Sequence, residues 1–209
     1  KKTALDEFSN PRKAGIIAVN LDEGDYLIGA ALTDGEHDVM LFSDGGKAVR
    51  FHEGDVRPLG RNARGVRGMT IEEGQSVIAM LVAEDGEQSV LTATENGYGK
   101  RTSIVEYTRH GRGTKGMIAI QQSERNGRVV AATLVHADDE IMLITDRGVL
   151  VRTRVSEIRE LGRATQGVTL IALDEGARLI GLQRIVENDA QAIIADSEDD
   201  SVDEQPPAE

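Results

Sequence analysis

Three hexapeptides in the chain are variants of one sequence: VMLFSD at residues 39–44, VLTATE at residues 90–95 and IMLITD at residues 141–146. Each begins 51 residues after the one before it. Without a gap, the same offset aligns further residues: Gly46, Gly97 and Gly148; Arg50, Arg101 and Arg152; Asp55, Glu106 and Glu157; Gly60, Gly111 and Gly162; Arg61, Arg112 and Arg163; and Gly65, Gly116 and Gly167. Coincidence does not hold register over so many positions, so the chain is built from a repeated unit.

Incomplete copies flank the full ones. Residues 2–8 repeat the spacing of residues 101–107, with a loop two residues shorter before Gly15, and LDEG at 173–176 repeats LDEG at 21–24. Either the two half-units complete each other by closing a ring, or the chain is a piece of a longer array. We favour the piece, because an orphaned hairpin strand at the start would leave backbone groups unpaired.

Within one unit the apolar pattern is that of β-strands. Runs such as 77–82 and 129–135 are too short for buried helices and are bounded by glycine or acidic turns. SDGG at 43–46 and TDRG at 145–148 predict hairpin turns in which glycine supplies a positive φ. Because a single blade cannot bury its faces alone, the sequence predicts an all-β, propeller-like domain over residues 1–186. It would contain about four four-stranded blades of ~51 residues.

Composition excludes several classes of protein. The 209 residues contain no cysteine, which excludes a disulfide-stapled module, a thiolate metal site and a cysteine nucleophile. No stretch approaches the ~18–20 apolar residues of a membrane span, so we expect a cytoplasmic protein with no membrane contact. GRGTKG at 111–116 has the letters of a dinucleotide fingerprint, but no helical pattern follows it. The four histidines have no ligand spacing, so we expect no catalytic residue, metal or cofactor in this segment.

The net charge of −12 is unevenly distributed. Residues 187–209 hold nine acids and no base, so the remainder carries −12 + 9 = −3. This single-sign, Pro-containing tail has the composition of a disordered segment.

The repeat also sorts the charge. Residues 46–68 and 97–119 each carry a net charge of +4 and residues 148–170 carry +2, whereas residues 18–45 and 69–96 hold seven and six acids and no base. Equivalent segments of a repeat lie at equivalent places, so the bases should form a continuous band suited to a sugar-phosphate backbone. No base-reading helix is evident, so we expect contact with phosphates and readout of DNA deformability.

The candidate DNA-contacting residues are Lys47, Arg50, Arg57, Arg61, Arg64, Arg67, Lys100, Arg101, Arg109, Arg112, Lys115, Arg152, Arg154, Arg159 and Arg163. Arg50 and its two repeat equivalents stand five residues before an acid, so a structural ion pair inside the blade is an equal alternative for them. A protein-interaction propeller, whose charged edges bind a partner protein, is the rival interpretation of the whole band.

Four motifs, GYGKRT (97–102), TKG (114–116), TRVSEI (153–158) and GRATQGV (162–168), give the chain a family resemblance. Over residues 1–186 it closely resembles the C-terminal domain of the GyrA-type subunit of bacterial DNA gyrase, which is a type IIA topoisomerase. The resemblance implies a β-pinwheel of usually six blades that exchange strands, of which this chain would supply about four. The short basic QRRGGKG box of the family's first blade is not in these residues, which leaves the related topoisomerase IV subunit open.

The resemblance also implies a function. Double-stranded DNA would wrap around the basic rim and support ATP-dependent negative supercoiling by a holoenzyme of two A and two B subunits. DNA cleavage, Mg²⁺ and ATP would be handled elsewhere in that holoenzyme, which acts on the nucleoid.

Overall fold

The computed structural model describes residues 1–84 and 86–186, and the predicted acidic tail, residues 187–209, lies outside the described residues. The strands are β1 (Asp38–Ser43), β2 (Lys47–His52), β3 (Val77–Ala83), β4 (Ser89–Thr94), β5 (Tyr98–Ser103), β6 (Met117–Ile118), β7 (Val129–Val135), β8 (Glu140–Thr145), β9 (Leu150–Arg154), β10 (Val168–Thr169) and β11 (Leu179–Ile185). The 3₁₀ turns are η1 (Leu5–Phe8), η2 (Glu53–Asp55), η3 (Ile104–Glu106) and η4 (Val155–Glu157). In these two ranges no helix is long and apolar enough to cross a membrane.

The strands form three antiparallel sheets, and each sheet contains the hairpin of one repeat. The strand orders are β3-β1-β2-β6, β10-β5-β4-β7 and β11-β8-β9. The first strand of each hairpin also pairs with the next long strand along the chain, so that β1 pairs with β3, β4 with β7 and β8 with β11. The predicted all-β repeat fold is therefore confirmed.

The fourth strand of a sheet comes from the following unit. β6 pairs with the outer edge of β2 through Lys47 opposite Ile118 and Ala48 opposite Met117. β10 pairs in the same way with β5, one repeat later. One sequence repeat is therefore not a self-contained blade, and the strand exchange implied by the family resemblance is present.

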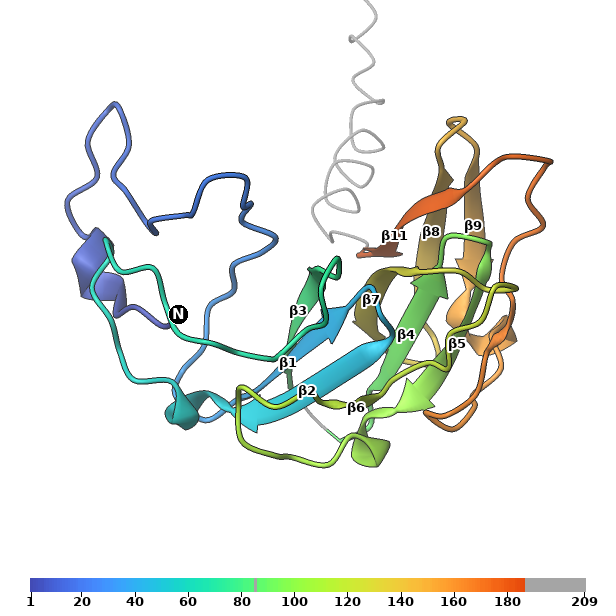
Figure 1. Ribbon diagram of the computed structural model, residues 1–209, viewed down its shortest axis with the longest axis horizontal. Helices are drawn as coiled ribbons and strands as arrows, with labels where there is room; N and C mark the ends of the chain where they lie inside the picture. The colour runs from blue at the N-terminus through green and yellow to red at the C-terminus, as the bar shows by residue number, and fades with distance from the viewer. Residues whose placement is uncertain (85, 187–209) are drawn as a thin grey trace, which may run out of the picture.

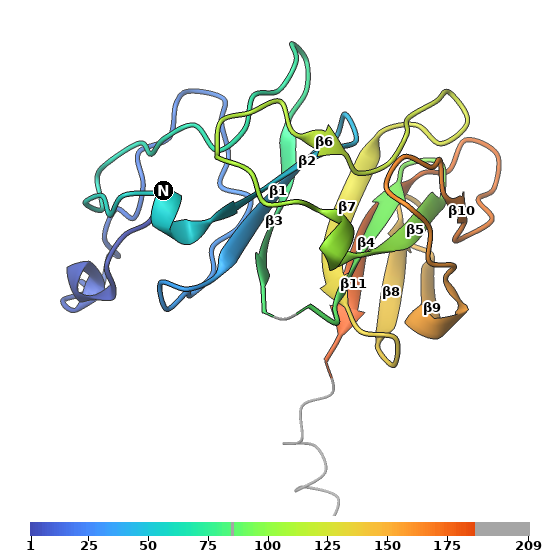
Figure 2. The same ribbon diagram turned by 90° about the horizontal axis from the view of Figure 1, so that it is seen from below.

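The sheets stand in chain order along an arc, with β3, β7 and β11 on its inner side and β2, β5 and β9 on its outer side (Figure 1). Figure 2 shows the segment before β1 lying beside the first sheet. This segment forms no long strand, but Lys2 makes a parallel bridge with Pro58, as Arg101 does with Glu160. The partial first copy inferred from the sequence therefore occupies its expected place next to the following unit.

The apolar core lies between neighbouring sheets rather than inside one. β4 is buried along its whole length, because Val90 faces the first sheet and Leu91 faces the third. Tyr107 packs edge to face on Phe42 in the first of these interfaces. In contrast, β9 has exposed and half-buried residues only, since no fourth strand and no further sheet from residues 1–84 or 86–186 cover it.

Substitutions at two glycines in equivalent hairpin turns can test how strongly an exchanged strand constrains a blade, because only one of the two turns has such a strand beside it among the described residues. Gly97 and Gly148 have φ values of 81° and 76°, so alanine is strained at both. A Cβ on Gly97 would lie 2.6 Å from the Ile171 carbonyl oxygen beside β10, whereas a Cβ on Gly148 would meet nothing within 4 Å. We expect Gly97→Ala to lower the free energy of unfolding by about 1–3 kcal/mol more than Gly148→Ala does. Urea unfolding followed by circular dichroism measures the difference; equal losses would contradict the constraint.

Candidate nucleic-acid interface

All fifteen candidate cations belong to the outer strand of a sheet or to the loop that follows it. The outer strands are β2, β5 and β9, and the loops that follow them are residues 53–68, 104–116 and 155–167. In Figure 1 the 3₁₀ turns that begin two of these loops, η2 and η3, both lie along the lower edge of the molecule, with β2 and β6 between them. The basic halves of the repeats thus occupy equivalent backbone positions in successive units.

Each loop covers the outer edge of the unit before it. The backbone N–H of Leu161 donates to the Arg101 carbonyl over 2.9 Å, and that of Leu59 donates to the Lys2 carbonyl over 2.8 Å. The N–H of His110 likewise donates to the Arg50 carbonyl over 2.8 Å. Because each unit caps the previous one, the outer surface runs from blade to blade without an open strand edge up to β9.

Six of the fifteen cations pair with carboxylates in the described residues, among them Arg64 with Asp22. The most buried of these carboxylates, Asp38, is 4% exposed, and its Oδ2 accepts from Arg50 Nε over 2.8 Å and from Arg109 Nε over 3.1 Å. The remaining pairs are Arg101–Glu160, Arg152–Glu140 and Arg154–Glu140.

These contacts correct the expected intrablade ion pair. Arg50 and Arg152 bind an acid at the start of the partner strand, Asp38 or Glu140, and not the acid five residues later. The reason is hairpin geometry, because positions diagonal across two strands lie on one face and within reach of a long side chain. One acid shared by two arginines leaves the local group with a net positive charge.

The loop arginines repeat one interaction three times. The Nη1 group donates to a backbone carbonyl two residues beyond the glycine that ends the preceding unit's loop. These bonds are Arg61 to Ile17 (2.7 Å), Arg112 to Arg67 (3.0 Å) and Arg163 to Ile118 (3.0 Å).

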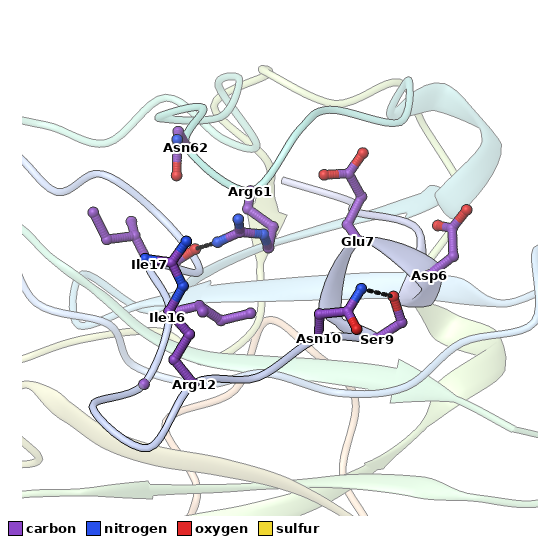
Figure 3. A pocket seen from close by; sticks show the side chains of 10 residues that line it. Asp6, Glu7, Ser9, Asn10, Arg12, Ile16, Ile17, Arg61 and Asn62 are labelled. Atoms are coloured by element: carbon purple, nitrogen blue, oxygen red, sulfur yellow. Dashed lines mark hydrogen bonds between the residues drawn. The ribbon is translucent and has the colours of Figure 1, made fainter.

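Figure 3 shows the first of these bonds at an open cleft of about 670 Å³. Since a guanidinium has five N–H donors, one such bond positions the group and leaves donors for another acceptor.

Lys100 does not lie at the surface, as a DNA-contacting residue would have to. It is completely buried, and its Nζ donates to the carbonyls of Gly162 (2.5 Å) and Arg163 and to Thr165 Oγ1 (3.1 Å). Burial lowers the pKa of the Lys100 ammonium to about 8, Glu106 acts in the opposite direction, and Arg163 lowers it further. A side chain with no exposed surface cannot reach a phosphate, so the prediction of a direct DNA contact for Lys100 is wrong.

Five cations are free of such restraints. Within the described ranges, Lys47, Arg57, Arg67, Lys115 and Arg159 have no side-chain hydrogen bond or ion pair, and all are exposed except the half-buried Lys47. Their side chains can move toward a ligand without first breaking an internal bond. With the braced loop arginines, they leave uncompensated charge in every unit of the rim.

Sequence reasoning missed one buried acid, Glu53. Its carboxylate accepts from Thr33 Oγ1 over 2.7 Å and from the N–H groups of Gly35 and His37. Burial acts to raise the pKa of Glu53, but the hydrogen bonds from these three residues outweigh it and hold the pKa below its ordinary value.

The role of Glu53 is to hold the loop at residues 33–37. Asp34, His37 and Glu53 each place one potential metal-ligand atom within 4.8 Å of the others. The hydrogen bonds to Glu53 explain why these three groups lie close together, because they hold the loop against the Glu53 carboxylate. A signal was present in the sequence, because the other copies have the apolar Ile104 and Val155 at this position.

Comparison with known proteins gives a consistent family. A family model described as the DNA gyrase C-terminal domain, beta-propeller, matches residues 1–34, 37–84, 88–136 and 139–185. The DNA gyrase A protein of Pseudomonas aeruginosa is 56% identical over 187 residues, which cover 90% of this chain and 20% of that protein. The DNA gyrase A protein of Escherichia coli K12 is 54% identical over 187 residues, covering 90% and 21%. The chain thus spans about a fifth of the length of these relatives.

Two solved structures share the architecture. The crystal structure of the C-terminal domain of DNA topoisomerase IV superimposes with a TM-score of 0.86 at 24% identity, covering 96% of this chain and 63% of that one. At that identity the likeness shows the fold alone. The structure of the DNA gyrase A C-terminal domain gives a TM-score of 0.76 at 30% identity, covering 83% and 59%.

The shared carboxylate of Asp38 allows a matched test. Arg50 is 20% exposed and Asp38 is 4% exposed, whereas Arg152 and Glu140 are 52% and 28% exposed. Asp38→Asn should lower the free energy of unfolding by about 2–4 kcal/mol, because it leaves a partly buried guanidinium uncompensated. Glu140→Gln should cost at most about 1 kcal/mol, since its pair is solvated. Denaturant unfolding followed by circular dichroism compares them, and an equal cost for both would refute this ranking.

Proposed function

Because the chain belongs to the DNA gyrase C-terminal-domain family, we propose that residues 1–186 bind double-stranded DNA along the outer rim and bend it without reading its sequence. The observation that carries this proposal is the recurrence of braced arginines and free cations at equivalent backbone positions in successive units. Such a row suits a phosphate backbone that passes several blades in turn.

The chemistry of the rim favours backbone contacts over base readout. No α-helix is present in the described ranges to enter a major groove, and the rim loops carry guanidinium and ammonium groups. Sequence preference would then come from the cost of deforming the duplex. Bending ~20–30 base pairs by ~40–90° costs on the order of 1–6 kcal/mol, which several charge-assisted phosphate contacts can offset.

In the full-length protein, this domain would present wrapped DNA to the strand-passage core. The proposed context is a cytoplasmic gyrase of two A and two B subunits that introduces negative supercoils into nucleoid DNA. ATP hydrolysis, Mg²⁺ and DNA cleavage would belong to other parts of that assembly. The 54–56% identities to gyrase A proteins support gyrase over topoisomerase IV, whose domain is similar at 24%.

Salt dependence tests the phosphate contacts. If ~6–10 phosphates are neutralised, affinity should fall by ~10³–10⁵ between about 50 and 200 mM salt, because bound counterions are released on binding. Fluorescence anisotropy of a labelled linear duplex of ~30 base pairs measures this fall. Binding that barely changes over that range would count against a phosphate-contacting rim.

Charge reversal tests the location of the contacts. Arg57→Glu, Lys115→Glu and Arg159→Glu should each weaken binding and reduce the salt slope by about 1, because each removes a free cation of the rim. These positions are preferred to the loop arginines, whose backbone bonds would make reversal a folding perturbation. Arg147→Glu, at the exposed tip of the β8–β9 hairpin and outside the basic segments, is the control; because Arg147 Nη2 donates to the Glu175 carbonyl over 3.1 Å, its circular dichroism spectrum is compared with that of the unmodified chain.

The same experiment separates DNA binding from the rival function. Unchanged wrapping in a variant that combines the three reversals, with the circular dichroism spectrum intact, would favour a protein-interaction propeller. A loss equal to that of Arg147→Glu would place the contacts outside the rim.

A further inference from the structure

We propose that Lys100 is a positioning residue that holds the Arg163 loop, residues 162–165, in place for DNA contact. This inference rests on the proposed function of the rim. Lys100 lies on β5 of one unit, whereas Arg163 belongs to the unit that follows. The side chain therefore connects two units beneath the surface that would face the DNA.

The buried ammonium depends on this loop for its hydrogen bonds. All three of its hydrogen-bond acceptors belong to the loop: the Gly162 and Arg163 carbonyls and Thr165 Oγ1. Moving the loop outward would leave a buried charge unpaired, which is costly in a low-dielectric interior. The loop is consequently restrained from below, while the Arg163 guanidinium is restrained separately by the Ile118 carbonyl.

The same lysine–carbonyl contacts appear in one neighbouring unit, where the lysine is exposed, and are absent from the other. Lys1 Nζ donates to the Gly60 carbonyl over 2.9 Å and to the Arg61 carbonyl, which are the repeat equivalents of the Lys100 acceptors. In the middle unit the equivalent position is Val49, which packs in a small apolar cluster with Phe51. The Arg112 loop thus keeps its guanidinium bond without a lysine beneath it.

A second restraint acts at the far end of the Arg163 loop. Asn126 is fully buried and its Nδ2 donates to the Gln166 carbonyl over 3.1 Å, while Arg125 Nη2 donates to the Gly167 carbonyl over 3.2 Å. A loop held at both ends loses little conformational entropy when its arginine binds a phosphate. The Arg112 loop is held in another way, because the guanidinium donates to the Asp55 and Arg67 carbonyls and Thr70 Oγ1 donates to the Gly113 carbonyl.

Amide hydrogen exchange tests the brace itself. The test variant is Lys100→Val, which imports the residue of the middle unit into the full 209-residue chain. The Arg163 N–H, which donates to Glu106 Oε2 over 3.0 Å, should exchange about tenfold to a hundredfold faster in this variant. Thr165→Val removes one hydrogen-bond acceptor of Lys100 at a half-buried position and should give a smaller increase in the exchange rate. This second variant keeps the test decisive if Lys100→Val fails to fold. Unchanged exchange in the folded variants would overturn the brace.

DNA affinity tests the positioning role through a double-mutant cycle. Lys100→Val should weaken binding of a ~30-base-pair linear duplex severalfold. In an Arg163→Ala background it should have no further effect, because Lys100 acts through Arg163. An equal loss in both backgrounds would overturn the proposal and indicate a general structural role. If the unmodified chain binds no duplex while Lys100→Val still accelerates exchange, the brace stands and the proposed function fails.

Discussion

The outer edge of each sheet is where backbone N–H and C=O groups would be left unpaired, and the chain satisfies them with segments of the next unit. β6 covers β2, β10 covers β5, and the loop backbone of each unit bonds to the outer strand of the unit before it. This requirement makes the blades interdependent. It also carries the basic loops to the outside of the arc, so the candidate interface is a by-product of edge protection.

The same arrangement explains how a rim of like charges is tolerated. Carboxylates lie where the charge is most buried, as Asp38 does between Arg50 and Arg109, and solvent screens the rest. Backbone carbonyls take the place of carboxylates for the loop arginines. A carbonyl orients a guanidinium without neutralising it, which keeps the net charge available for a polyanion.

Differences between the copies are as informative as their likeness. Glu53 stands where the other units have apolar residues and fixes a loop, and Val49 stands where another unit has the buried Lys100. Each exchange alters local restraint and leaves the register of the strands unchanged. The repeat thus holds the architecture constant while the individual units hold their loops through different side chains.

The repeat, the strands, the hairpin turns and the alternation of charge could all be predicted from the sequence, because each follows from residues that are close together or at a fixed period in the chain. The sequence did not determine that Lys100 is buried, or that Arg50 pairs with Asp38 and not with Asp55. The burial of Lys100 depends on which unit covers which edge, a relation between segments about 60 residues apart, whereas the Arg50–Asp38 pair depends on the strand register of the β1–β2 hairpin. Only the tertiary structure decided both outcomes, because burial and partner geometry determine whether a cation faces the solvent or the interior.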